Sequence, residues 1–518
     1  MSSPKISHEK ILVLDFGSQT SQLIARRVRD LSVWCELVPC TIPYEKVVEA
    51  APKGLILSGG PDSVYREGAP QMDPRLATAL GIPILGICYG MQLLGKVLGG
   101  KVAGGAGREF GRADLQVVDP APLFKGLPRV QQVWMSHGDS VERPPDGFLV
   151  TGKTEITSCA AMADVKRSFY AIQFHPEVAH TVYGREILRN FLFEICGCRG
   201  DWKVASLSEE LVERVRDQVQ DGKVVLGISG GVDSTVAAAV IHRAIGERLH
   251  PIFVDTGLLR KDEGDQVERA LRQELGIPLT RIDAAEEFVG ALKEVEDPEE
   301  KRRRIGKVFV DVFQREAGKI GKVDFLAQGT LYPDVIESTS FAGPSAVIKT
   351  HHNVGGLPQS MRLTLVEPLR ELFKDEVRRL GAAMGVPAVL LGRHPFPGPG
   401  LAVRILGEVT RERLAVLREA DAIFIAELAR EGIYDQVAQA FAVLLPVRSV
   451  GVMGDFRTYE NVCALRAVST EDFMTADWTR LPADFLARVS TRIVNEVRGI
   501  NRVVYDISSK PPSTIEWE

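Results

Sequence analysis

Twice along this chain, a short apolar run leads through a glycine-containing turn into helical sequence, at residues 82–92 and at residues 223–235. A buried strand followed closely by a helix is the repeating unit of α/β folds. Similar runs recur between residues 10 and 200, and a second series begins near Ser208. The sequence therefore predicts two α/β domains, the first with a sheet that is parallel in its first half and the second doubly wound.

The length of the chain also argues against a single core, because one core seldom serves more than about 250–300 residues and this chain has 518. A stretch rich in proline and glycine, residues 394–400, interrupts the pattern of strands and helices and restricts the backbone. We place a domain boundary there. The predicted domains span residues 10–200, 204–394 and 395–518, and the last is a small α+β domain.

The composition is typical of a globular protein and excludes several other classes. Apolar residues make up 45% and charged residues 25% of the chain, which is too apolar for a disordered protein, and a formal net charge of -5 predicts no nucleic-acid partner. No apolar run approaches the roughly 18 residues of a membrane span, and residues 1–10 lack the core of a signal peptide. The 7 cysteines are irregularly spaced, as reduced thiols are. We therefore expect a cytoplasmic protein that binds no membrane.

Residues 82–92 have the spacing of a nucleophile elbow with Cys88 at the turn. Gly86 and Gly90 flank Cys88 as glycines flank the serine of G-x-S-x-G, leaving room for a strained turn that lifts the side chain clear of the sheet. The N-terminus of the following helix favours the reactive thiolate, and the backbone N–H of Tyr89 is suited to stabilise an oxyanion. The alternative is an inert buried thiol, the commoner state of a free cysteine.

A matching base and acid follow the strand predicted at residues 170–174. His175 and Glu177 are two residues apart, so on extended backbone both side chains project to one side. The carboxylate can then orient the imidazole while the other ring nitrogen faces Cys88. A lone histidine is more often a core or surface residue, but nucleophile, base and acid together predict a catalytic site. Gly59, at the end of another strand, offers a second oxyanion N–H group.

With these residues the first domain resembles the class I glutamine amidotransferases. The resemblance implies that Cys88 attacks the side-chain amide of glutamine, that His175 protonates the departing ammonia and that Glu177 fixes the histidine. The residues at the family's oxyanion positions are Gly59 and Tyr89.

The second strand, turn and helix segment, residues 223–235, is suited to bind phosphate. Gly230 and Gly231 allow backbone N–H groups to point at an anion, and the following helix adds the positive end of its dipole. The segment lacks the lysine of the Walker A pattern G-x-x-x-x-G-K-[ST], so transfer of a γ-phosphoryl group is not expected. Asp233 would repel bare phosphate, which indicates an Mg²⁺ ion between its carboxylate and the phosphates.

The string S-G-G-x-D-S in this segment resembles the ATP pyrophosphatase family, whose fold is like that of the adenine-nucleotide α-hydrolases. The resemblance implies that ATP is split between its α- and β-phosphates and that AMP is transferred to a substrate. Adenine would lie beside Val254 by the switch-point rule, although ordinary sheet core is the alternative for that residue. The ATP-binding residues of the turn are then Ser229, Gly230, Gly231, Val232, Asp233, Ser234 and Thr235.

A glutaminase domain and an adenylating domain in one chain indicate amide or amidine synthesis with nitrogen from glutamine, but neither motif names the acceptor. Over residues 11–518 the chain resembles the bacterial glutamine-hydrolysing GMP synthetases, with specific matches at residues 348–353, 374–378 and 506–518. This resemblance implies that xanthosine monophosphate (XMP) is adenylated at its C2 oxygen and that ammonia displaces AMP to give GMP. The alternative is an adenylating amidotransferase with a different acceptor.

The same resemblance implies roles for residues outside the shared motifs, and a homodimer formed through the C-terminal domain. Lys374 would reach the ATP phosphates. Without the resemblance, Lys510, which precedes two prolines, would be interpreted as a solvated tail residue. The pair His351 and His352 would be interpreted as surface residues or metal ligands. The implied XMP-binding residues are Arg260, Lys510, Ile515 and Glu516. The implied lid residues are Lys349, His351 and His352.

Overall fold

The computed structural model of the protein describes residues 8–18, 20–339, 363–453, 456–470, 473 and 475–518. The chain forms two compact units: the first ends at Leu207 and the second begins at Ser208, except that a short segment beginning at Ile336, the end of α11 (Tyr332–Thr339), is grouped with the first. We call them unit 1 and unit 2. Within the described residues, no helix is both long and apolar enough to cross a membrane.

Unit 1 is built on a sheet with the strand order β2-β1-β3-β4-β9-β8-β7-β5-β6. The strands from β2 to β9 are parallel, which confirms the prediction for the first half of this sheet. The middle strands β3, β4 and β9 are buried along their whole length, as parallel strands covered by helices must be. The parallel strands are Lys10–Asp15 (β1), Trp34–Pro39 (β2), Gly54–Leu57 (β3), Ile84–Ile87 (β4) and Phe169–Ile172 (β9).

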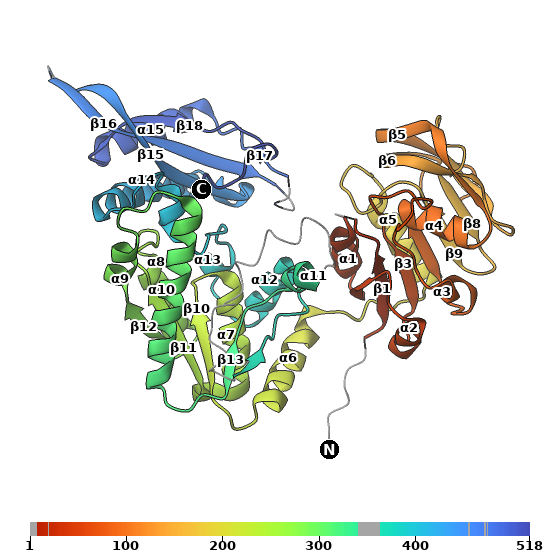
Figure 1. Ribbon diagram of the computed structural model, residues 1–518, viewed down its shortest axis with the longest axis horizontal. Helices are drawn as coiled ribbons and strands as arrows, with labels where there is room; N and C mark the ends of the chain where they lie inside the picture. Colours follow the sequence, from red (N-terminus) through yellow and green to blue (C-terminus); the bar gives the residue numbers. More distant parts are fainter. Residues whose placement is uncertain (1–7, 19, 340–362, 454–455, 471–472, 474) are drawn as a thin grey trace. The chain divides into compact units, whose positions relative to one another are not determined.

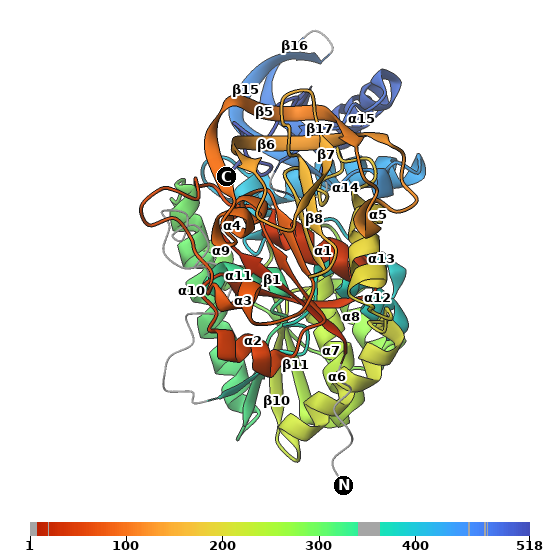
Figure 2. The ribbon, with the colours of Figure 1, turned by 90° about the vertical axis from the view of Figure 1, so that its right-hand side faces the viewer.

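The other half of this sheet is antiparallel, and its long outer pair β5 and β6 is visible in Figure 2. These strands are Lys101–Val117 (β5), Val130–Arg143 (β6), Leu149–Lys153 (β7) and Ala161–Asp164 (β8). The helices of unit 1 are Ser21–Asp30 (α1), Tyr44–Ala50 (α2), Arg75–Thr78 (α3), Tyr89–Val97 (α4) and Gly184–Arg189 (α5).

Unit 2 begins with a fully parallel sheet in the order β12-β11-β10-β13-β14. In chain order this is 3-2-1-4-5, so the direction of winding reverses between β10 and β13, and the predicted doubly wound sheet is confirmed. Figure 1 shows α7 and α10 on its two faces. The strands are Val224–Ile228 (β10), Leu249–Asp255 (β11), Thr280–Asp283 (β12), Phe325–Ala327 (β13) and Thr364–Val366 (β14).

Helices connect these strands, and the longest of them shows how sequence sets a helix start. Asp297 accepts a hydrogen bond from the Glu300 N–H, and Pro298 occupies the first helical position, where its missing N–H costs nothing. The helices are Val204–Val219 (α6), Val232–Ile245 (α7), Glu263–Arg269 (α8), Ala285–Ala291 (α9), Pro298–Lys319 (α10), Tyr332–Thr339 (α11), Lys374–Ala383 (α12) and Ala388–Leu391 (α13).

The C-terminal part has its own sheet, in which the long antiparallel pair β15 and β16 is joined by β17 and β18, so the predicted α+β character is confirmed. One hydrophobic core nevertheless runs from Val254 and Phe313 to Leu444 and Val489. Because of this shared core, the boundary predicted at residue 394 lies inside one compact unit. The elements are Arg411–Arg430 (α14), Gln439–Met453 (β15), Phe456–Ser469 (β16), Asp477–Trp478 (β17), Ala483–Glu496 (α15) and Ile500–Tyr505 (β18).

Candidate active sites

Cys88 occupies the turn between β4 and α4 with a φ of 52° and a ψ of -106°, a strained conformation for a residue with a side chain. The chain around it is crowded. A Cβ atom on Gly90 would lie 2.4 Å from the carbonyl oxygen of Leu57, and one on Gly86 would lie 2.8 Å from the carbonyl carbon of Gly90. Both glycines are therefore required, as in a nucleophile elbow.

The predicted base and acid lie beside Cys88 because β9 pairs with β4, and the Cys88 N–H donates to the Ile172 carbonyl at 2.8 Å. His175 Nδ1 is 2.7 Å from Glu177 Oε1, and the Glu177 side chain is fully buried. Burial alone would lower the pKa of His175, but the charge of Glu177 and hydrogen bonds with Cys88 and Glu177 raise this pKa well above its ordinary value. The structure thus brings the predicted triad together.

The residues predicted for the oxyanion site lie at the same place. A Cβ atom on Gly59 would be 3.2 Å from His175 Cε1, so the Gly59 backbone passes directly beside the imidazole. Tyr89 is the first residue of α4, and its hydroxyl donates to the Pro70 carbonyl at 2.6 Å. That hydrogen bond fixes Tyr89, the residue directly after Cys88, whose backbone N–H is predicted to stabilise the oxyanion.

Two buried glutamines that the sequence motifs did not predict, Gln173 and Gln92, also lie near Cys88. Gln173 Nε2 donates to Cys88 Sγ at 3.6 Å, and Gln92 Nε2 donates to the Asp139 carbonyl at 2.7 Å and to Gln173 Oε1 at 3.3 Å. The alternation of side chains on extended backbone was the signal that could have found Gln173, since it precedes His175 by two residues. Gln92 follows Cys88 by one helical turn.

The turn predicted to bind phosphate lies after β10, at the point where the winding of the parallel sheet reverses, which is where doubly wound sheets bind nucleotides. Gly230 has a φ of 79°, which favours glycine. Hydroxyl groups shape the turn: Ser229 Oγ is 3.1 Å from Ser234 Oγ and accepts from the Gly231 N–H, while Thr235 Oγ1 donates to the Gly231 carbonyl at 2.9 Å. The remaining member of the string, Val232, begins α7.

Asp233, in the first turn of α7, is paired with Lys374 at the start of α12, with 3.6 Å between Nζ and Oδ2. Burial raises the pKa of Asp233, and the charge of Lys374 opposes that rise. Its other oxygen, Oδ1, is buried and has no hydrogen-bond partner among the described residues. A carboxylate with an oxygen to spare beside a phosphate turn fits an Mg²⁺ ion, which proteins usually hold through one or two carboxylates and the phosphates. Val254 lies in β11 with its side chain in the sheet core.

Glu516 is held by side chains that the sequence did not single out. Arg404 donates to both of its carboxylate oxygens, at 2.9 and 3.2 Å, and Gln439 Nε2 donates to Oε1 at 2.7 Å. Arg404 is fully buried, and its guanidinium lies 4.1 Å from the ring centre of Phe441 and 5.0 Å from that of Phe396. The proline- and glycine-rich stretch carries Phe396, so it forms one wall of this cluster.

A chain of contacts links the phosphate turn with Arg260. Arg393 Nη1 donates to the Gly230 carbonyl at 3.2 Å and lies 3.5 Å from Glu263 Oε1, while Glu263 Oε2 accepts from the Arg260 N–H at 3.0 Å. Arg260 also donates to the Ala440 carbonyl at 3.0 Å. Gly230, predicted to bind ATP, and Arg260, predicted to bind XMP, are therefore connected within unit 2 through Arg393 and Glu263.

The tail that carries the other predicted XMP residues is fastened to the C-terminal sheet. Arg466, fully buried in β16, donates to the carbonyls of Ser508 and Thr514. Ile515 packs in a small apolar cluster on β15 and β16, and Lys510 Nζ donates to the Phe473 carbonyl at 2.7 Å. The predicted lid residues lie outside the described residues; they are Lys349, His351 and His352.

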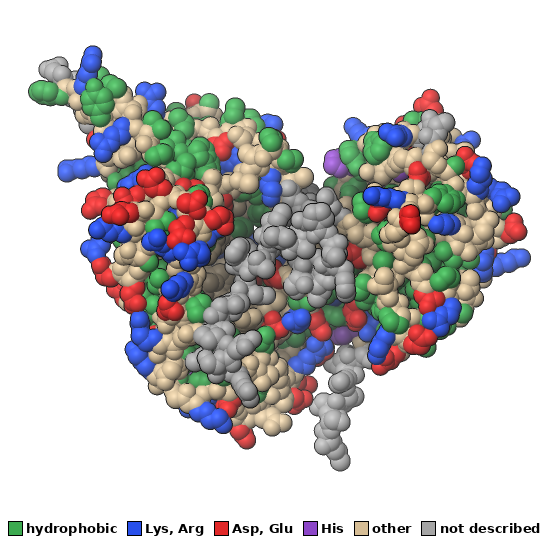
Figure 3. All heavy atoms as spheres, viewed as in Figure 1, with side chains coloured by type: hydrophobic (Ala, Val, Ile, Leu, Met, Phe, Trp, Pro, Cys, Tyr) green, Lys and Arg blue, Asp and Glu red, His purple; other side chains and the backbone are tan. Residues whose placement is uncertain are grey.

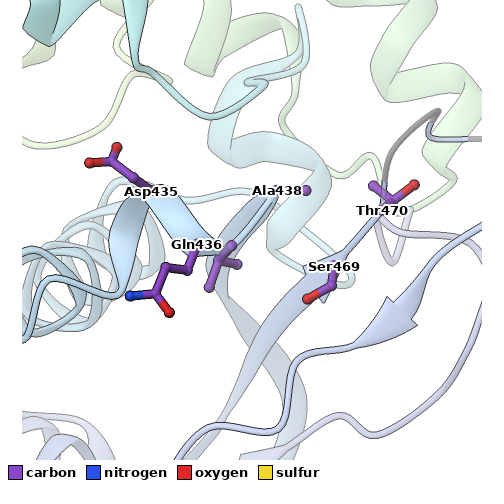
Figure 4. A pocket seen from close by; sticks show the side chains of 6 residues that line it. Asp435, Gln436, Ala438, Ser469 and Thr470 are labelled. Atoms are coloured by element: carbon purple, nitrogen blue, oxygen red, sulfur yellow. The ribbon is translucent and has the colours of Figure 1, made fainter. Parts of the chain in front are cut away.

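A hollow of about 450 Å³ opens where β15 begins and β16 ends (Figure 4). None of the predicted site residues lines it, although Gln439 is next in sequence to the lining residue Ala438. The hollow is lined by Asp435, Gln436, Val437, Ala438, Ser469 and Thr470.

Three family models match successive parts of the chain: glutamine amidotransferase class-I over residues 12–195, NAD synthase over residues 204–307 and GMP synthase C terminal domain over residues 426–517. The NAD synthase match covers the part that contains the phosphate turn. The other two matches cover the triad and the tail.

Proteins named glutamine-hydrolyzing GMP synthase are similar along the full length. The one from Aquifex aeolicus (strain VF5) is 58% identical over 98% of this chain and 99% of its own length. The one from Solidesulfovibrio magneticus is 58% identical over 98% of this chain and 99% of its own, and that from Azoarcus sp. (strain BH72) is 58% identical over 99% and 100%. The chain belongs to the family of glutamine-hydrolysing GMP synthases.

Proposed function

We propose that this chain makes GMP from XMP, with ATP as the activating substrate and glutamine as the source of nitrogen. The observation that carries the proposal is the occurrence, in one chain of this family, of an assembled Cys88–His175–Glu177 triad and a glycine turn without a Walker lysine. The first suits amide hydrolysis and the second suits adenylation.

In the glutaminase half-reaction, the Cys88 thiolate attacks the side-chain carbonyl carbon of glutamine, and the oxyanion is held by the backbone N–H groups of Gly59 and Tyr89. His175 gives its proton to the nitrogen as the C–N bond breaks, and ammonia leaves. Water then cleaves the thioester to release glutamate. The raised pKa of His175 supports this role, because the imidazolium must be present when the amine departs.

In the synthetase half-reaction, the C2 oxygen of XMP attacks the α-phosphorus of ATP, and pyrophosphate leaves. Ammonia then attacks C2, and AMP departs with the C2 oxygen to give GMP. Backbone N–H groups of the Ser229 to Thr235 turn bind the phosphates, and Lys374 adds a positive charge. An Mg²⁺ ion held by Asp233 would neutralise charge on the pyrophosphate leaving group.

XMP is assigned to the cluster around Arg260, Lys510, Ile515 and Glu516. Two observations support this: Arg260 is linked to the predicted phosphate turn through Glu263 and Arg393, and Arg404 donates hydrogen bonds to both carboxylate oxygens of Glu516. A carboxylate fixed in this way can accept hydrogen bonds from the ring N–H groups of the purine. Residues 395–518 are thus proposed as the XMP-binding domain, after a synthetase domain at 204–394 and a glutaminase domain at 10–200.

We also propose a homodimer formed through the C-terminal domain, in the cytoplasm. The end of the β15 and β16 pair exposes apolar side chains, with Val452 75% and Phe456 79% exposed. Figure 3 shows hydrophobic side chains gathered on this part of the surface. Exposed apolar clusters usually mark an interface. The exposed apolar residues of this pair are Val447, Val450, Val452, Phe456 and Tyr459.

Two substitutions should separate the half-reactions. In Cys88→Ala, we expect GMP formation from glutamine to be lost and GMP formation from added ammonia to be kept, because only the first needs the thiol. In Asp233→Asn, both should be lost. Chromatography of the nucleotides measures each outcome. GMP formation from glutamine by Cys88→Ala would refute the nucleophile, and ADP in place of AMP would point to a different use of ATP.

Replacing Glu177 by glutamine should slow glutamine hydrolysis by about 10²–10⁴-fold, the usual contribution of acid–base catalysis. The charge of Glu177 raises the pKa of His175, so its loss lowers that pKa and the imidazolium is lost at lower pH. The alkaline limb of the pH–rate profile for glutamate release should therefore move to lower pH. The matched variant Glu142→Gln, at a half-exposed glutamate of unit 1, should leave the profile unchanged. An unshifted limb in Glu177→Gln would contradict the assignment.

The dimer is tested by Val452→Asp, which places a charge in the exposed apolar cluster. Light scattering of the purified protein should show the mass of a dimer for the wild type and half of that mass for the variant. Val182→Asp is the control, because Val182 is a similarly exposed valine of unit 1. A wild-type protein with the mass of a single chain would disprove the dimer.

A further inference from the structure

We propose that Gln173 is a positioning residue that holds Cys88 as the thiolate, and that Gln92 fixes the direction in which the Gln173 amide points. The inference rests on the proposed role of Cys88 as the nucleophile of glutamine hydrolysis. It assigns a function to a buried hydrogen-bond relay that the triad does not include. The relay runs from the Asp139 carbonyl through Gln92 and Gln173 to Cys88 Sγ.

The direction of the relay is set by a backbone group. The Asp139 carbonyl can only accept a hydrogen bond, so the Gln92 atom 2.7 Å from it must be the amide nitrogen. The same nitrogen lies 3.3 Å from Gln173 Oε1, so it also donates there. With its oxygen occupied in this way, Gln173 must turn its nitrogen to Cys88 Sγ, 3.6 Å away. Flipping the Gln92 amide would bring two acceptors together, and flipping the Gln173 amide would bring two N–H donors together.

The relay is shielded from water, so the hydrogen bond from Gln173 to Cys88 Sγ discriminates more strongly between the thiolate and the thiol. Gln173 is fully buried, Gln92 is 3% exposed and Cys88 is 5% exposed. Hydrogen bonds to a charged partner are roughly twice as strong as neutral ones, and a buried site strengthens them further. An N–H group aimed at sulfur therefore stabilises the thiolate more than the thiol.

The other neighbour of the sulfur has the opposite preference. Cys88 Sγ lies 3.7 Å from the Ser136 carbonyl, which can accept a hydrogen bond from the thiol but repels the thiolate. When the thiol of Cys88 loses its proton, it can no longer donate to the Ser136 carbonyl, whereas its hydrogen bond from Gln173 becomes stronger. Gln173 therefore compensates for a carbonyl that would otherwise favour the unreactive form of Cys88.

Gln173 and His175 both lie in the short segment that follows β9, and they have different roles. His175 receives and delivers a proton, and so its charge changes during the reaction. The Gln173 amide keeps its proton throughout. It can therefore stabilise the thiolate before sulfur attacks the amide carbon, and again when the C–S bond of the thioester breaks and the thiolate is the leaving group.

The test is the pH dependence of Cys88 alkylation by iodoacetamide in the full-length protein, followed by mass spectrometry of the peptide that contains Cys88. In Gln173→Leu, the midpoint of the profile should move to higher pH by about 1 unit or more, the effect of losing one hydrogen bond to a charged group. In Gln173→Glu, which keeps the shape but brings an acid to the sulfur, the midpoint should rise further. Gln92→Leu should give a smaller rise, because the Gln173 amide is then free to turn.

Gln131→Leu is the matched control, since Gln131 is a buried glutamine of β6 whose amide donates to the Pro128 carbonyl. Its midpoint should equal that of the wild type. GMP formation from added ammonia reports whether each variant is folded. Wild-type midpoints in both Gln173 variants, even with slower alkylation at every pH, would overturn the proposal and leave Gln173 a packing role. Failure of Cys88 as the nucleophile would instead appear in Cys88→Ala.

Discussion

Both reaction centres depend on one property of parallel sheets, which is that the carboxyl ends of neighbouring strands meet at the same edge. In unit 1, β3, β4 and β9 are adjacent, so the residues that follow them, Gly59, Cys88 and His175, converge although they are far apart in sequence. In unit 2, the same edge presents the Ser229 turn at the point where the winding reverses. Each turn then runs into a helix whose N-terminus favours negative charge, which suits the proposed nucleophile in one case and the proposed phosphate ligand in the other.

Buried charged and polar groups do different work in the two units. In unit 1, Glu177 holds the imidazole of His175, and Gln173 of the glutamine relay donates a hydrogen bond to the Cys88 sulfur. In unit 2, Arg404 and Arg393 hold neighbouring segments together: Arg404 fixes Glu516, and Arg393 ties the phosphate turn to Glu263. Because buried arginines must be paired, these contacts also make the proposed adenylating site depend on the C-terminal tail and on the proline-rich stretch.

Local sequence patterns predicted those parts of the fold and of the site that depend on residues close together in the chain. The strand, turn and helix segments around Cys88 and Ser229 were found because their glycines stand at regular spacing beside Cys88 and at a turn where Gly230 has a positive φ. The long pair β5 and β6 was not predicted, since its glycine-rich, mixed sequence has no clear periodicity. Gln173, Arg404 and Gln439 were missed as well, because their partners lie 85, 112 and 77 residues away in the chain. The GMP synthase activity came from resemblance, and the full-length relatives bear it out.

The central claim is that nitrogen released at the cysteine site is captured by a purine activated with AMP. The most direct measurement supplies glutamine labelled with heavy nitrogen in its side-chain amide, together with XMP, ATP and Mg²⁺, and follows the label by mass spectrometry. The account predicts label on the exocyclic amino group of every GMP formed, with one AMP and one pyrophosphate for each. Unlabelled GMP, or ADP and phosphate as the accompanying products, would contradict it.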